Sequence, residues 1–404
     1  MDGVGLCYKP LKTMHPAKQS TSVIFRGLGS FSLLVSLFWT CARAPACARN
    51  GLGNVDSLAQ SAPGTQAESD LVTGIALTHQ GDFTSAIPHL LAARGRVADE
   101  YAANFDLALC YVATNQYQDA VGILASLANG GHATADVNNL LAQAYIGAGQ
   151  PQKALAAFQQ AVQQTSLDEK LYLLVADACM DHESYDLGTE ILNIGLQHLP
   201  RSSRLHYERG VFLTFQNQAD LAKSDYKMAA KLAPGTDISY MALGQNDLLE
   251  GNLPGAIEIT RKGIRAGHEN YILLTIFGDA VVRSGATPDE RVFADAQQAL
   301  EKSVTERPNY AASQLALGEL YLADGRLDAA VVHLENARQL APQDPAVYSH
   351  LAIAYRRQGR TDQVQQVLTI LSKLNRQQAE KYKTDSPNKY GYIASGRTVQ
   401  PPSQ

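Results

Sequence analysis

The sequence predicts an all-α fold, an α-solenoid of about nine stacked helix-turn-helix units. Three observations support this prediction. Apolar residues recur every three to four positions in paired stretches, which is the spacing of an amphipathic helix. A glycine or an asparagine separates the two stretches of nearly every pair. The same columns return in steps of 34 residues over about 300 residues, a length over which chance does not keep several columns in phase.

The segment 311–344 shows one unit in full. Leucines spaced by three to four residues give each of its two helices one apolar face. Gly325 separates the helices, at a position where the backbone turns left-handed and a side chain would be strained. Gly318 and Ala330 are the small residues that we expect to face each other where the two helices cross. Pro342 ends the second helix.

The other units follow in the same register. Steps of 34 residues, with one step of 40 before the eighth unit, place the unit starts at residues 67, 101, 135, 169, 203, 237, 271, 311 and 345. The eighth place of every unit is Gly or Ala, as a close helix crossing requires. The turn places, where we predict a left-handed residue, are Gly81, Asn115, Gly149, Glu183, Asn217, Gly251, Gly285, Gly325 and Gly359.

A 34-residue unit with Leu and a small residue at the seventh and eighth places, Tyr at the eleventh, Ala at the twentieth and Pro at the thirty-second resembles the tetratricopeptide repeat. The resemblance spans residues 67–376. It implies a right-handed solenoid whose first helices line a concave groove, with the second, fifth, ninth, twelfth and thirteenth places facing a ligand. Chaperone-binding members carry a Lys and Asn clamp there that grips a C-terminal carboxylate. This chain lacks that clamp.

On this resemblance, units four to six offer a binding surface for a protein or peptide. Their groove-facing places and the polar residues around them are Lys170, Leu173, Asp177, Met180, Asp181, Arg204, Tyr207, Val211, Phe215, Met241, Gln245, Leu248 and Leu249. An apolar stripe rimmed by charge suits an extended or helical peptide segment. The alternative is that these side chains pack between neighbouring first helices. Tyr207 and Phe215 distinguish the two, because both are large enough to act as anchors.

Residues 1–48 have the pattern of a secretory signal peptide. Lys18 and Arg26 precede the apolar run 28–40, and Ala-x-Ala cleavage patterns follow it. The run is too short to span a bilayer as a helix, which takes about 20 residues. We therefore expect an exported protein, periplasmic or extracellular, without a membrane span after cleavage. An uncleaved signal or a lipidated cysteine would instead anchor it to the membrane.

Composition divides the rest of the chain. Residues 49–66 are rich in Gly, Ser, Asn and Gln and predict a flexible linker. The second helix of the ninth unit continues through 377–384 as a polar cap, and 385–404 is predicted to be a disordered tail. In the seventh unit, Thr287 to Glu290 form a capping-box pattern. We therefore expect the insertion there to lengthen the second helix at its start.

The sequence contains none of the common enzyme motifs. It has no GxxxxGK[ST], no HExxH, no GxSxG and no CxxC. The carboxylates around His182 are interpreted as a solvated turn, because a metal needs converging ligands. A formal net charge of −5 without basic runs disfavours nucleic acid as a partner. We therefore predict a protein that is not an enzyme and that holds no cofactor or metal.

The favoured function is a non-enzymatic protein–protein interaction scaffold of the bacterial cell envelope, with a protein or peptide segment bound in the concave groove. A related hypothesis is an adaptor in a secretion or assembly machine, for polysaccharide export, pilus or outer-membrane protein biogenesis. An enzyme or metal-binding protein with an unrecognised site is the alternative from another class. Stoichiometric metal in the purified protein would favour that alternative.

Overall fold

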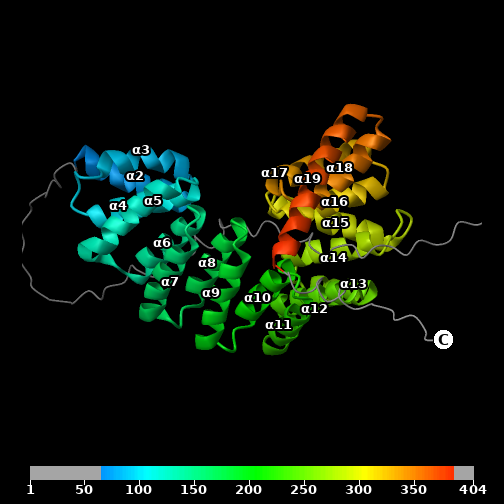
Figure 1. The fold of residues 1–404 in the computed structure, drawn as a ribbon, viewed down its shortest axis with the longest axis horizontal. Coiled ribbons are helices and arrows are strands. Elements are labelled where there is room, and N and C mark those ends of the chain that lie inside the picture. The colour runs from blue at the N-terminus through cyan, green and yellow to red at the C-terminus, as the bar shows by residue number, and fades with distance from the viewer. Residues whose placement is uncertain (1–64, 386–404) are drawn as a thin grey trace, which may run out of the picture.

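The computed structural model describes residues 65–385, in which every regular element is helical (Figure 1). The predicted signal peptide (1–48), nearly all of the predicted linker (49–66) and the predicted tail beyond Asp385 lie outside the described residues. The helices alternate as first and second helices of successive units: α2 (Gln66–Gln80), α3 (Phe83–Ala93), α4 (Glu100–Ala113), α5 (Tyr117–Leu127) with the short π-helix η1 (Ala128–His132), α6 (Ala135–Gly147), α7 (Pro151–Thr165), α8 (Glu169–Asp181), α9 (Tyr185–His198), α10 (Ser203–Phe215), α11 (Ala219–Leu232), α12 (Asp237–Glu250), α13 (Leu253–Arg265), α14 (Tyr271–Arg283), α15 (Arg291–Glu306), α16 (Ala311–Ala323), α17 (Leu327–Leu340), α18 (Pro345–Arg357) and α19 (Thr361–Asp385).

Each first helix begins at, or one residue before, the predicted start of its unit. Side-chain caps explain several of these starts. The Ser202 hydroxyl accepts a hydrogen bond from the backbone N–H of Leu205 at the start of α10, and Asn270 does the same for Leu273 in α14. At the other end of the chain, α19 continues to Asp385 and includes the segment predicted as a cap.

The predicted left-handed turns are present at all nine turn places, because φ is positive at each of them. Three of the nine are not glycine: Asn115 (φ 63°), Glu183 (φ 53°) and Asn217 (φ 58°). At the last of these, the Asn217 N–H donates to the carbonyl of Thr214, which satisfies a carbonyl at the end of α10. The prediction is therefore confirmed, including at Glu183, where a side chain makes this backbone conformation costly.

The eighth-place glycines lie against a different residue of the second helix from the one predicted. A Cβ atom at Gly318 would come within 2.7 Å of Leu334 Cγ, and the nearest atoms to Gly278 likewise belong to Leu300. The expected neighbour, Ala330, is one helical turn earlier than Leu334. Because residues four apart lie on the same side of a helix, the spacing alone did not separate the two. The predicted contact between Gly318 and Ala330 is corrected accordingly, although Ala330 is fully buried.

The insertion in the seventh unit forms a turn and lengthens the second helix at its start, though from Arg291 and not from Thr287: α15 begins five residues before Ala296, whereas α17 begins three residues before Ala330. α15 begins at Arg291 with Glu290 as its N-cap. The Glu290 carboxylate accepts hydrogen bonds from the backbone N–H (2.8 Å) and the hydroxyl (3.0 Å) of Thr287. The Thr287 hydroxyl therefore acts as a donor here and does not cap a backbone N–H of the helix. Only half of the capping box forms.

The units stack into an arc, which descends in Figure 1 from α2–α5 at the left to α10 and α11 at the bottom and rises to α16–α19 at the right. First helices of successive units contact each other along the whole series. Within residues 65–385, α7 and α9 are the successive second helices that make repeated close contacts, and the other pairs of second helices make few or none. The first helices therefore line the concave side of the arc, as the resemblance implied.

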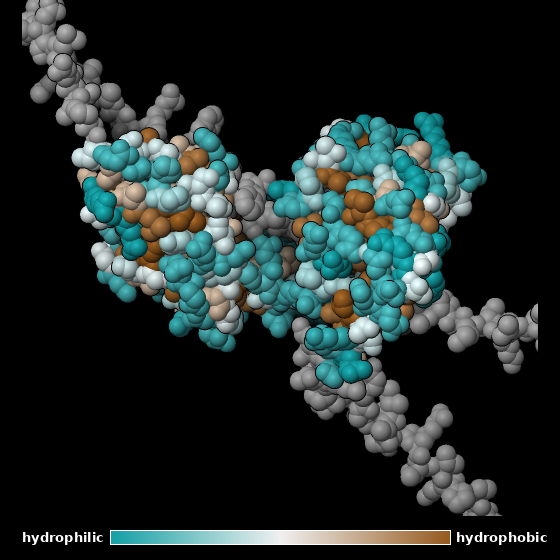
Figure 2. Space-filling model, turned by 90° about the horizontal axis from the view of Figure 1, so that it is seen from above, coloured by the Kyte–Doolittle hydropathy of each residue, from teal (hydrophilic) through white to brown (hydrophobic). Residues whose placement is uncertain are grey.

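Two hydrophobic clusters fill the space between the helices and meet at α14. Ile272 and Ile276 belong to the cluster of the earlier units, whereas Leu274 and Phe277 belong to that of the later units. Seen from above, apolar side chains gather on both ends of the arc, and hydrophilic ones cover most of the surface around them (Figure 2). No helix between residues 65 and 385 is both long and apolar enough to cross a membrane.

Candidate binding surface on the concave side

The predicted groove residues lie on the first helices α8, α10 and α12, in the middle of the arc. Their accessibility differs widely, and the differences decide which of them a partner can reach. Lys170 and Asp181 are exposed. By contrast, Asp177, Arg204, Phe215 and Leu249 are half-buried, and Leu173, Met180, Tyr207, Val211, Met241, Gln245 and Leu248 are buried.

Tyr207 is fully buried in the hydrophobic cluster of the earlier units. Its ring lies 5.8 Å from that of Tyr226 on α11, measured between ring centroids. This position assigns Tyr207 to packing between helices, which was the alternative to an anchor role. Val211, one turn further along α10, is buried in the same cluster.

Phe215 keeps part of its surface accessible. Its ring stacks on that of Tyr185 in α9, with the centroids 5.0 Å apart and the planes 2° from parallel. The pair joins the fourth and fifth units at the end of α10. Of the two aromatic residues considered as anchors, Phe215 is therefore the one that a partner can contact without displacing the core.

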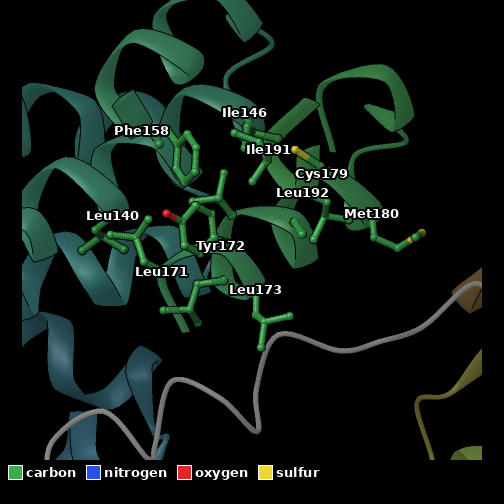
Figure 3. Packing of buried hydrophobic residues seen from close by; sticks show 14 of the residues in the cluster. Leu140, Ile146, Phe158, Leu171, Tyr172, Leu173, Cys179, Met180, Ile191 and Leu192 are labelled. Carbon is green, nitrogen blue, oxygen red and sulfur yellow. The ribbon is translucent and has the colours of Figure 1, made fainter. Parts of the chain in front are cut away.

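The inner side of α8 carries Leu173 and Met180. Figure 3 shows both side chains directed away from Phe158 and Tyr172, which pack against each other on the other side of the helix. Asp177 is four residues after Leu173 and three before Met180, so the three residues share one face of α8. The Asp177 carboxyl therefore lies between the apolar side chains of Leu173 and Met180 on this face of α8.

An ion pair lies on the neighbouring helix α10. Arg204 Nε is 2.7 Å from Glu208 Oε1, one helical turn away. The Glu208 side chain is almost completely buried, whereas that of Arg204 is partly accessible. Glu208 was not among the predicted site residues, because the sixth place of a unit does not face the ligand in the family. The spacing of four residues from Arg204 was the one signal of its involvement.

The surroundings of the Asp177 carboxyl disfavour its charged form. Burial raises the pKa of its carboxyl well above the usual range, the charge of Glu208 adds to the rise, and Arg204 opposes it. No residue between 65 and 385 donates a hydrogen bond to the Asp177 carboxylate. The ionised form of Asp177 is therefore disfavoured until a cation approaches it.

The curvature of the arc brings later units close to the same residues. Burial and the neighbouring Tyr271 raise the pKa of Tyr310, and the charge of Glu208, about one hundred residues earlier, raises it further. The rings of Tyr271 and Tyr310 meet edge to face, with their centroids 5.1 Å apart. The influence of Glu208 on Tyr310 could not be predicted from the sequence, because a repeat register does not specify how tightly the solenoid coils.

Besides Arg204 Nε and Glu208 Oε1, which pair with each other, three buried polar atoms on α10 and α12 have no hydrogen-bond partner: the Tyr207 hydroxyl, Gln245 Nε2 and Asn246 Oδ1. Each such atom costs about 1–3 kcal/mol of stability. Native structures contain few of them, so a group of three on adjacent helices requires an explanation. A bound ligand that supplies hydrogen bonds is one.

The acidic turn around His182 shows no metal-binding arrangement. His182 Nε2 lies 2.9 Å from the hydroxyl oxygen of Tyr117 on α5. In the part of the chain that the structure describes, no three His, Cys, Asp or Glu residues are grouped as metal ligands.

Comparison with known proteins gives matches over both halves of the chain. Two family models described as tetratricopeptide repeat match, one at residues 77–144 and 322–384 and the other at 139–193 and 290–345. Among curated proteins, the chain is similar to the BBSome complex member BBS4 of Bos taurus, with 24% identity over 166 residues. The match covers 41% of this chain and 31% of that protein, so the chain spans less than a third of the length of this relative.

Several solved structures are also similar. The APC/C hetero-tetramer Cut9-Hcn1 shares 17% identity, and the match covers 77% of this chain and 61% of that chain with a TM-score of 0.47. YrrB, described as a TPR protein with an unusual peptide-binding site, shares 17% identity, and the match covers 46% of this chain and 93% of that chain with a TM-score of 0.32. MamA shares 21% identity, and the match covers 42% of this chain and 96% of that chain with a TM-score of 0.33. The family matches fall on the helix pairs and left-handed turns described above. This chain belongs to the tetratricopeptide repeat family.

Proposed function

We propose that the concave face of α8, α10 and α12 binds a segment of a partner protein, and that the protein does so as an exported scaffold of the bacterial cell envelope. The tetratricopeptide repeats support the role of a protein–protein interaction scaffold. The observation that carries the position of the binding surface is the buried, unsatisfied Nε2 atom of Gln245 on α12. Gln245 occupies a place that faces the ligand in the family, and a bound peptide offers it a hydrogen-bond partner.

The same face has the mixture of groups that recognises a peptide. Phe215 and Leu249 offer half-buried apolar contacts, and Lys170 and Asp181 offer exposed charges on α8. Apolar anchors in such a surface supply most of the affinity, and polar groups around them set the register of the bound segment.

Photo-crosslinking tests the binding face. A benzophenone amino acid replaces Lys170, an exposed residue of the first helix α8, and in a matched variant replaces Leu221, an exposed residue of the second helix α11. Each variant is irradiated in an extract of the cell envelope. We expect a discrete adduct from position 170 and none from position 221. Adducts from position 221 alone would place the binding surface on the outer side.

Export is tested separately by sequencing the N-terminus of the mature protein. Cleavage of the predicted signal peptide gives a soluble product that starts between residues 48 and 52. A membrane-bound product that retains residues 14–40 would contradict export with cleavage and leave the binding surface unaffected.

A further inference from the structure

We propose that the groove between α13 and α15, on the outer side of the arc, is a second binding surface that takes an acidic side chain, an Asp or Glu within an otherwise apolar segment of a partner protein. The carboxylate is received by Arg261, Lys262 and Arg265 of α13. The groove is formed by second helices, so it is separate from the concave face and goes beyond the proposed function.

The insertion in the seventh unit forms one wall of this groove. The groove has a volume of about 630 Å³ and is lined by α13 on one side and by Ser284, Glu290 and Val292 on the other. Glu290 belongs to the insertion, and Val292 follows it at the start of α15. α14 lies between the two second helices (Figure 1). The groove is therefore a feature that the insertion adds to the repeat.

Arg261 is the least exposed cation of the groove. Its Cζ atom lies 5.5 Å from the centroid of the Phe277 ring on α14. Its Nη2 atom is 3.7 Å from Asp295 of α15, which is longer than a hydrogen bond. Its Nε atom is buried and has no hydrogen-bond partner within residues 65–385. The guanidinium group therefore keeps unused hydrogen-bonding capacity at the groove.

Lys262 and Arg265 carry the positive charge further along α13. Both side chains are exposed and line the same groove. Neither forms an ion pair or a hydrogen bond with another residue in the described part of the chain. Ammonium and guanidinium groups bind carboxylates through charge-assisted hydrogen bonds, so an Asp or Glu side chain of a ligand complements them.

Two carboxylates also line the groove and limit the charge of the ligand. Glu290 accepts hydrogen bonds from the backbone N–H (2.8 Å) and the hydroxyl (3.0 Å) of Thr287, so it is held to the insertion. Glu258 is exposed on α13 and repels further negative charge. Three cations against two carboxylates leave a surplus of one positive charge. A single carboxylate matches this surplus, whereas a polyanion exceeds it.

The remaining lining of the groove is apolar. Ile257 packs against both hydrophobic clusters and Val292 against that of the later units, and both stay partly accessible. Pro254 continues this surface toward the start of α13. Apolar ligand side chains remove it from water.

The length of the groove suits a short peptide. Pro254 and Arg265 are eleven residues apart, roughly 16 Å along the helix. An extended peptide of about five residues spans this length. Its apolar residues lie toward Pro254 and its acid toward Arg265, because the cations occupy the second half of α13.

A random dodecapeptide phage library provides the probe. It is selected on the immobilised full-length protein and depleted on the Lys262→Gln/Arg265→Gln variant, which removes peptides bound to the concave face. The most enriched sequence is synthesised with a fluorescent label, and its Kd is measured by anisotropy. We expect an Asp or Glu beside apolar residues. Replacing this acid by its amide should weaken binding about tenfold or more.

Two further variants test the place of the peptide, because depletion already selects for dependence on Lys262 and Arg265. Glu258→Gln removes a repelling carboxylate and should tighten binding about two- to fivefold. A benzophenone amino acid in place of Ser284, on the opposite wall of the groove, should crosslink to the peptide. The same amino acid at Lys170 on the concave side should not.

A matched control separates the groove from general electrostatics. Lys373→Gln/Arg376→Gln makes the same two changes at the same spacing on exposed positions of α19 and should leave Kd unchanged. Lys262→Gln/Arg265→Gln should change the melting temperature little, because both side chains are exposed.

The other outcomes would overturn this site and leave the concave surface unaffected. They are a selection in which nothing survives depletion, a peptide that binds equally well as its amide, and crosslinking at position 170 without crosslinking at 284. Vesicles containing phosphatidylglycerol are tested in parallel by sedimentation. Vesicles that bind the wild type but not Lys262→Gln/Arg265→Gln would assign the groove to anionic lipid in place of a protein segment.

Discussion

Gly318 of α16 and Leu334 of α17 touch where the two helices of the eighth unit cross. A Cβ atom on Gly318 would lie 2.7 Å from Leu334 Cγ, which is closer than real Cβ contacts. The backbone nitrogen of Leu334 would also lie 3.3 Å from it, so the second helix itself limits any movement. The contact shows why the eighth place of a unit must be small.

The first prediction is that Gly318→Ala destabilises the protein by about 1–3 kcal/mol through overpacking. Gly122→Ala in α5 is the matched control, because nothing lies within 4 Å of a Cβ atom there. That change should stabilise the helix by up to about 1 kcal/mol. Urea unfolding of both variants measures the difference, and equal shifts would show that the helices do not cross at Gly318.

Glu183 gives a prediction for the turns. It is the one turn residue of the nine that is neither Gly nor Asn, and its φ is 53°. A left-handed conformation costs a residue with a Cβ about 1–2 kcal/mol, part of which glycine recovers. We therefore expect Glu183→Gly to raise the free energy of unfolding by about 0.5–1 kcal/mol. A loss of stability in urea unfolding would mean that the contacts of the Glu183 side chain outweigh the strain.

These turns also show how much of the fold could be predicted. A left-handed turn depends on one residue and its immediate neighbours, so a column of Gly and Asn locates it. The starts of the first helices were predicted from the 34-residue step, and caps such as Ser202, which act within three residues, explain several of them. The contact between Gly318 and Leu334 depends on the angle between two helices, which the register does not contain. It was therefore missed by one turn.

The candidate site was less predictable than the fold. The register identified Asp177 and Phe215 as residues of the concave side. It could not separate Phe215, which stays accessible, from Tyr207, which Tyr226 and the later units cover. Glu208 entered the site through its ion pair with Arg204, for which the spacing of four residues was the one local signal. Its influence on Tyr310, about one hundred residues later, follows from the coiling of the whole array and has no local signal.

Asp106 predicts a pH dependence of stability. It is buried on α4 with one oxygen unsatisfied, and burial, aided by Asp99, raises its pKa to about 7 from 3.8. Because the unfolded chain releases this proton first, stability is lost as pH rises from about 4 to 7 and then levels off. Asp106→Asn should therefore match the wild type near pH 4 and exceed it by on the order of 1–3 kcal/mol above pH 7. Urea unfolding as a function of pH measures this, and a constant difference would contradict it.

Tyr207 and Phe215 should respond differently to truncation. Tyr207→Ala removes a fully buried ring and should cost about 3–5 kcal/mol of stability. Phe215→Ala removes a half-buried ring and should cost less, while it weakens peptide binding by about 1–2 kcal/mol. Melting temperature and affinity are measured on both variants. An unchanged affinity of folded Phe215→Ala would remove Phe215 from the binding surface.

Hydrogen exchange of the protein alone and with a peptide selected on it from a random phage library shows whether the first helices bind the partner on the concave side of the arc. We expect backbone amides of α8, α10 and α12 to exchange more slowly when the peptide is bound, while those of α9 and α11 are unchanged. Slower exchange in α9 and α11, with none in α8 and α10, would contradict it.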